Sequence, residues 1–179
     1  MRCSTAIRSR LTMSAGVRRN PLSHILKVLT GTCRNSAHDG CDDHRRFEEL
    51  LKQGEETTER AAKRRRQLLD MLTREVNEHE LMEEQVLYPA LEPRAQAREI
   101  VLEGYEEHHV ADVITNELRD VTPDDERWAA KFKVLKESLE HHIKEEERNM
   151  FRTAHAVLSR DELSELGARM KALKAESRR

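Results

Sequence analysis

Two short motifs, each a histidine followed four residues later by a glutamate, constrain the fold of this chain more than any other feature. They are His79-x-x-x-Glu83 and His142-x-x-x-Glu146. Residues four apart lie on one face of an α-helix, one turn above the other. Burying such side chains without partners costs roughly 2–7 kcal/mol for a neutral polar group and more for a charge. If these faces are buried, a metal ion is the natural partner for both side chains.

Both motifs lie on apolar helical stripes. The stripes are Leu69, Leu72, Val76, His79, Glu83 and Val86, and Trp128, Phe132, Leu135, Leu139, His142 and Glu146. Steps of three and four residues are typical of a helix packed against other helices. Because a polar pair replaces leucines in two such stripes, the sequence predicts a buried polar site built from two helices.

The composition predicts an all-α protein. The 179 residues suffice for one domain with a real core, and they include only six glycines and four prolines among abundant helix-forming residues. No apolar run approaches the roughly 18 residues needed to cross a membrane. We predict an up-down-up-down four-helix bundle with an additional C-terminal helix.

The charge distribution separates a leader from the folded domain. Residues 1–38 contain seven Lys and Arg and no acid, whereas residues 39–179 contain 25 basic and 34 acidic residues. An acidic body argues against nucleic acid as the main partner. We expect 1–38 to be a basic, disordered leader, or translation to start at Met13 or later. The alternative is an organelle-targeting peptide, whose composition this segment shares. Three unclustered cysteines, Cys3, Cys33 and Cys41, favour a reducing compartment, the cytoplasm.

The domain, residues 39–179, divides into a bundle core at 41–157 and a fifth helix at 160–176. Start and stop signals predict five helices. The first runs from Cys41 or Asp42 to a turn at Gly54–Thr58, or on through Gly54, and the second runs from Glu59 to Tyr88 and stops at Pro89. The third runs from Arg94 to Asp120, the fourth is capped by Thr122 and runs to Val157, and the fifth is capped by Ser159.

The first and third helices each contribute one inward histidine. His44 precedes His79 by 35 residues and His108 precedes His142 by 34, so the chain reads as two similar hairpins. His109 is the alternative to His108, turned by about 100° on the helix. Residues symmetric about a bundle loop lie at the same height. The sequence therefore predicts one layer of six metal ligands: His44, His79, Glu83, His108, His142 and Glu146.

Other polar residues lie close to these six in the sequence. Glu48, Glu80 and Asp112 could supplement it, although each position is more often a solvated helix residue. Tyr105 could lie above the site or simply pack. His141 and His155 are expected outside the ligand set, and the basic run Lys63–Arg66 on a solvated face. A polar core network without metal is the alternative to a metal site.

Four imidazoles and two carboxylates suit two metal ions with open coordination positions. This donor set favours non-haem iron, and manganese or zinc less specifically. A closed structural zinc site needs only four ligands, usually with cysteine among them. The zinc-protease motif H-E-x-x-H is absent at His79, because Glu83 stands where a second histidine is needed.

Four segments resemble the signature of the hemerythrin-like, HHE cation-binding domains. They are Asp43–Leu51, His79–Glu83 followed by Tyr88-Pro89, Glu107-His108-His109, and His142–Glu146. The resemblance covers about residues 41–157. It implies a four-helix bundle around an oxo- or hydroxo-bridged pair of iron ions, with the two glutamates bridging.

The chain departs from the oxygen-carrying hemerythrins at two positions. Those proteins have a second histidine one turn after the third-helix histidine, where this chain has Asp112, and they end in His-x-x-x-x-Asp rather than His142-x-x-x-Glu146. The resemblance therefore implies binding or sensing of oxygen, nitric oxide or peroxide rather than reversible oxygen carriage. The alternatives are a redox enzyme of peroxidase or ferroxidase type, an iron-handling protein, and a structural interaction bundle with a stabilising metal.

Overall fold

The structure, a computed structural model, describes residues 42–177. The expectations for the leader and for the three cysteines fall outside these residues. Within the described range the chain is all-α and contains no strand. No helix in this range is both long and apolar enough to cross a membrane.

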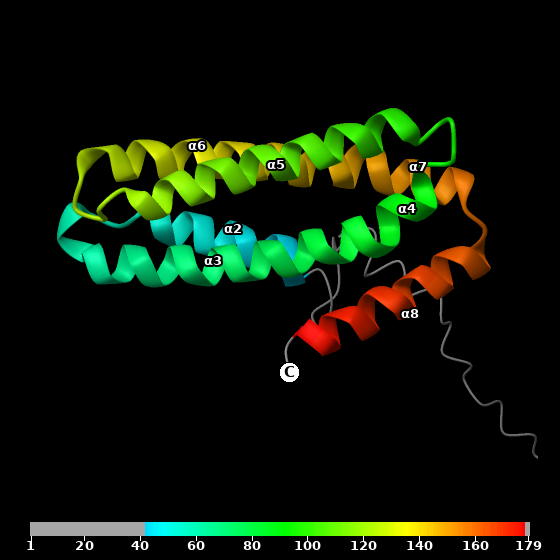
Figure 1. Ribbon diagram of the computed structural model, residues 1–179, viewed down its shortest axis with the longest axis horizontal. Coiled ribbons are helices and arrows are strands. Elements are labelled where there is room, and N and C mark those ends of the chain that lie inside the picture. The colour runs from blue at the N-terminus through cyan, green and yellow to red at the C-terminus, as the bar shows by residue number, and fades with distance from the viewer. Residues whose placement is uncertain (1–41, 178–179) are drawn as a thin grey trace, which may run out of the picture.

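The helices follow the predicted order. Their bounds are α2 Asp42–Glu55, α3 Ala62–Met82, α4 Tyr88–Leu91, α5 Arg98–Asp120, α6 Glu126–Glu145, α7 Phe151–Val157 and α8 Arg160–Ser177, with a 3₁₀ turn, η1, at Glu59–Ala61. Two π-helical turns, η2 at Glu83–Leu87 and η3 at Glu146–Met150, join α3 to α4 and α6 to α7. Each π turn is therefore part of one long, continuous helical segment (Figure 1).

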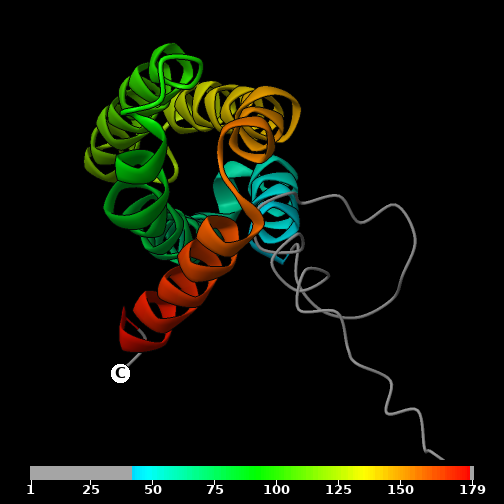
Figure 2. The ribbon, with the colours of Figure 1, turned by 90° about the vertical axis from the view of Figure 1, so that its right-hand side faces the viewer.

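The long segments lie side by side. Helix α2 packs against α3 and α6, and α5 packs against α6 and α3. Seen from one end, the segments surround a common interior, and α8 lies across the outside (Figure 2). Helix α8 contacts α3 and η2. The capping of α8 is confirmed: Ser159 Oγ accepts from the Glu162 N–H, and Glu162 accepts from the Ser159 N–H at 2.7 Å.

Helix α2 takes the longer of its two predicted courses and runs on through Gly54. A Cβ at Gly54 would lie only 2.1 Å from Cζ of Phe132. The glycine thus serves close packing rather than a turn. Other element ends differ from the predictions. The second segment passes Pro89 and ends at Leu91, and α5 begins at Arg98 rather than at Arg94. Thr122 does not cap the fourth helix; Asp125 does, with its carboxylate accepting from the Arg127 N–H at 2.8 Å.

Two apolar clusters fill the interior. One contains Phe47, Leu51, Leu72, Val76, Ala111, Trp128, Phe132 and Leu139 among others, and the second contains Met82, Val86, Leu91, Val101, Met150, Phe151 and the buried side of α8. Along α3 the first cluster ends at Val76 and the second begins at Met82, with His79 between them. The polar layer thus separates the two clusters and is covered by apolar side chains at both ends.

Candidate metal centre

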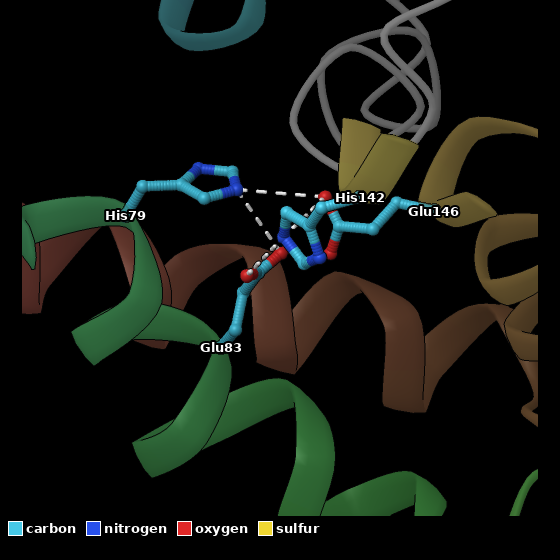
Figure 3. Close-up of side chains that lie close together, drawn as sticks. All are labelled: His79, Glu83, His142 and Glu146. Atoms are coloured by element: carbon cyan, nitrogen blue, oxygen red, sulfur yellow. Dashed lines mark ion pairs between the residues drawn. The ribbon is translucent and has the colours of Figure 1, made fainter. Parts of the chain in front are cut away.

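Six buried side chains converge between the two clusters. Helix α2 contributes His44, the α3–η2 segment His79 and Glu83, helix α5 His108, and the α6–η3 segment His142 and Glu146. The glutamates are the most deeply buried of the six, each with 1% of its surface exposed. Figure 3 shows the two His/Glu pairs pointing toward one another from their separate segments.

The histidines form two pairs around the glutamates. Nε2 of His44 lies 3.4 Å from Nε2 of His79. Oε2 of Glu146 lies 3.1 Å from the first and 3.6 Å from the second of these nitrogens. Oε1 of Glu83 lies 3.2 Å from His79 Nε2. The first pair of imidazoles therefore faces one oxygen from each glutamate.

The second pair, His108 and His142, faces the same carboxylates from the other side. Oε2 of Glu83 lies 3.3 Å from His108 Nε2 and 3.9 Å from His142 Nε2. Oε2 of Glu146 lies 3.6 Å from His142 Nε2. Each glutamate therefore contacts both histidine pairs, Glu83 through its two different oxygens and Glu146 through Oε2.

A further carboxylate faces the outer nitrogen of every histidine, within hydrogen-bond distance for all but His79. The contacts are His142 Nδ1 to Glu107 at 2.9 Å, His108 Nδ1 to Glu84 at 2.9 Å, His44 Nδ1 to Glu147 at 3.1 Å and His79 Nδ1 to Asp43 at 3.9 Å. Histidines that bind metals usually donate their second N–H in this way, which fixes the tautomer and directs the other nitrogen at the ion.

Sequence reasoning missed these outer acids, although a signal was present. One acid directly precedes each lone histidine, at Asp43 and Glu107, and the other directly follows each inner glutamate, at Glu84 and Glu147. The two halves of the chain repeat this pattern at a spacing of 63 or 64 residues. The repeat therefore extends to the groups that orient the imidazoles.

The π turns were also missed. Each begins at an inner glutamate, and its wider hydrogen bond runs from Tyr88 N–H to the Glu83 carbonyl or from Phe151 N–H to the Glu146 carbonyl. Isolated π turns within α-helices often occur at functional sites. Reading the sequence at 3.6 residues per turn gives no signal for them.

The carboxylates control the protonation of the layer. Burial alone would lower the pKa of His44, but its hydrogen bonds to the two glutamates of η3 raise the pKa to about 9. The pKa of His108 is likewise raised to about 9 by glutamates of η2, against the effect of burial. Burial alone would raise the pKa of Glu146, but the charge of His142 and the close contacts with His44 and His79 hold it well below the usual range.

Several buried atoms at the centre lack an aligned hydrogen-bond partner. They are Oε2 of Glu83, Nε2 of His142 and both carboxylate oxygens of Glu146. An unpartnered buried charge is costly, and these four atoms belong to facing side chains. A cation between them would satisfy all four, so the donor set and its geometry fit a metal centre.

The other residues considered as metal ligands differ clearly in burial. His108 is buried and contacts the layer, whereas His109 is exposed. Glu80 is buried, and burial raises its pKa to about 7. Glu48 and Asp112 are exposed, as are His141 and His155. Of the proposed supplementary acids, only Glu80 lies inside the molecule.

Tyr88, rather than Tyr105, reaches the layer. The Tyr88 hydroxyl and His108 Nε2 share a hydrogen bond of 3.2 Å, and the two rings are stacked with 5.4 Å between centroids. Tyr105 packs edge-on against Tyr88 at 4.8 Å. Sequence reasoning placed Tyr88 at the end of a helix and in a segment that resembles the family signature, but not at the site.

A comparison with protein families agrees with this geometry. Residues 42–154 match the family model described as the hemerythrin HHE cation binding domain. No curated protein and no solved structure matches the chain. The match covers more than half of the chain and includes all six converging side chains, so this protein belongs to the hemerythrin HHE cation-binding family.

Proposed function

We propose that the buried layer holds two iron ions and that the protein binds or senses oxygen, nitric oxide or peroxide there. The proposed ligands are His44, His79, Glu83, His108, His142 and Glu146. The observation that supports this most directly is the orientation of the four histidines: every Nε2 faces at least one of the two inner glutamates and every Nδ1 faces an outer carboxylate.

The contacts support a division of ligands between two ions. His44 and His79 would hold one, His108 and His142 the other, and Glu83 and Glu146 would bridge them. The packing of the helical segments further supports an up-down-up-down four-helix bundle with α8 outside it. Bound iron supplies redox chemistry and free coordination positions for small ligands, since imidazole and carboxylate donors of this number do not fill both ions.

The surrounding side chains restrict what can reach the ions. Phe47 lies edge-on to His79 with 5.4 Å between ring centroids, and Phe151 stacks over His44 at 6.2 Å. The two apolar clusters close the layer at both ends. Such walls favour small, weakly polar ligands over larger polar substrates.

Metal content tests the centre itself. Protein expressed in iron-replete medium is expected to contain close to two iron ions per chain. His79→Ala and His142→Ala are each expected to lower that content, while His155→Ala, an exposed histidine on α7, leaves it unchanged. Elemental analysis that returns no iron, or one zinc at full occupancy, would contradict the proposal.

Ligand exposure tests the function. Reduced, iron-loaded protein exposed separately to oxygen, nitric oxide and peroxide is expected to show a visible absorption change that reverses on reduction or ligand removal. Multiple-turnover loss of peroxide that Glu83→Ala blocks would instead identify a redox enzyme. If metal removal lowers the melting temperature but no reagent changes the spectrum, the metal is structural.

A further inference from the structure

The two halves of the site differ at one position. Tyr88 follows Glu83 by five residues, and Phe151 follows Glu146 by the same interval. Tyr88 stacks on His108 with 21° between ring planes, and Phe151 stacks on His44 with 12°. An aromatic ring therefore covers one histidine in each half, but only the Tyr88 ring carries a hydroxyl. Because phenylalanine fills the same role in the other half, stacking alone does not require that oxygen.

The π turn brings this oxygen to the metal layer. At about 100° per residue, a residue five positions after Glu83 in a regular α-helix would lie about 140° away from it. The wider π turn instead bonds Tyr88 N–H to the Glu83 carbonyl and carries both side chains toward the same face. The space for the hydroxyl comes from Gly104, where a Cβ would lie only 2.6 Å from it.

The position of the oxygen suits a metal ligand. It lies 3.2 Å from Nε2 of His108. Two donor atoms at about 2.0–2.2 Å from one ion and roughly at right angles are about 3 Å apart. Among the described residues, this nitrogen is the one hydrogen-bond partner the structure gives the hydroxyl. Once a metal takes Nε2, the hydroxyl must turn to the ion or stay buried without a partner, at a cost of about 1–3 kcal/mol.

We propose that Tyr88 is a ligand of the ion held by His108 and His142, an assignment that rests on the proposed iron centre. The phenol releases its proton to solvent as its oxygen binds. The two ions then differ, since the His44 and His79 ion has no equivalent ligand. An anionic oxygen donor favours iron(III) over iron(II), so this half of the centre would hold its oxidised state more strongly.

The test uses the visible spectrum of the iron(III)-loaded full chain. The wild type is expected to show a phenolate-to-iron(III) charge-transfer band, with phenolate ring vibrations in the resonance Raman spectrum. Tyr88→Phe is expected to lose at least nine-tenths of that band while retaining its iron. Tyr105→Phe is the matched control and is expected to keep the band, because Tyr105 contacts Tyr88 but not the histidines.

The small number of tyrosines in the chain makes the source of such a band unambiguous. The chain has two tyrosines, Tyr88 and Tyr105, so a band that survives Tyr105→Phe can come only from Tyr88, even if Tyr88→Phe fails to fold. Iron-loaded wild type without the band, or Tyr88→Phe with the band intact, overturns the assignment and leaves the iron centre standing. A wild type that binds no iron overturns both.

Discussion

At the residue scale, the site is a balance of buried charges. Four imidazoles face two inner carboxylates and are held from behind by four outer ones. In the metal-free protein this balance raises the pKa of His44 and of His108 to about 9 and also raises that of His79 and His142. His44 and His108 are therefore protonated near neutral pH, and a metal must displace their protons to bind.

Metal affinity is consequently expected to rise with pH between about 6 and 9 and to be accompanied by proton release. Stability without metal should change in the opposite direction. Groups with a raised folded-state pKa stabilise fully below their unfolded value of 6.5, and the stabilisation is lost as pH rises through about 9. The melting temperature of the metal-free protein should fall by several degrees between pH 6 and pH 9. Zinc titration in weak buffer measures the proton release, and an affinity independent of pH would contradict this account.

The outer carboxylates give a second prediction at this scale. Glu107→Gln removes the charge that orients His142 and is expected to weaken metal binding about 10–100-fold. Glu103→Gln is the matched control, because Glu103 lies one turn away on the same helix and is exposed. Competition with a chromogenic chelator measures both affinities. Equal losses in the two variants would point to general surface charge rather than to orientation of His142.

The six inner residues could be predicted from the sequence because helical periodicity puts them on apolar stripes, where a polar side chain is conspicuous. Glu107 and Tyr88 could not be identified by this argument. A single acid beside a histidine is indistinguishable from a solvated helix residue, and only its recurrence in the other half of the chain gives a sequence signal. The direction of Tyr88 depends on the π turn, which changes the angular position of every residue after it.

At the scale of elements, close contacts between helices explain why the sequence signals at Gly54 and Arg65 were misleading. Gly54 suggested a turn but allows the Phe132 ring to approach α2. Arg65 belongs to a basic run expected on a solvated face, yet it is buried. It donates to Thr57 Oγ1 at 2.9 Å and to the Pro123 carbonyl at 2.6 Å, and it lies over the Trp128 ring. Gly54 brings α2 close to α6, and Arg65 links the loop after α2 to the start of α6. Neither contact can be read from local sequence, because both depend on tertiary packing.

Gly54→Ala is expected to destabilise the protein by about 1–3 kcal/mol, because the new Cβ would overlap Phe132 while the helical backbone would otherwise gain from alanine. Lys52→Ala, an exposed change in the same turns of α2, should alter stability by less than about 0.5 kcal/mol. Urea denaturation of metal-free protein measures both. A stabilised Gly54→Ala would show that the contact with Phe132 relaxes without cost.

At the scale of the whole molecule, α8 connects one apolar cluster to the polar layer of histidines and glutamates. Its Leu163, Leu166 and Met170 are buried in that cluster, and farther along it Lys174 pairs with Asp43. Asp43 is the acid that faces Nδ1 of His79. Burial alone would raise the pKa of Asp43, but the nearby His79 and Lys174 charges and the hydrogen bonds from Lys174 hold it below the usual range. The last helix thereby contacts the site through one carboxylate.

Lys174→Met tests whether this contact matters for the metal. The change keeps an apolar stem but removes the charge, so Asp43 can turn away from His79 and the imidazole is less firmly oriented. A loss of metal affinity of roughly tenfold is expected, at the lower end of the effect of such outer groups. The loss of stability without metal should stay below about 1 kcal/mol, because both partners are partly exposed. Lys171→Met, an exposed change on the same helix, is the control for charge alone. If the two variants bind metal equally well, α8 contributes only to the apolar core.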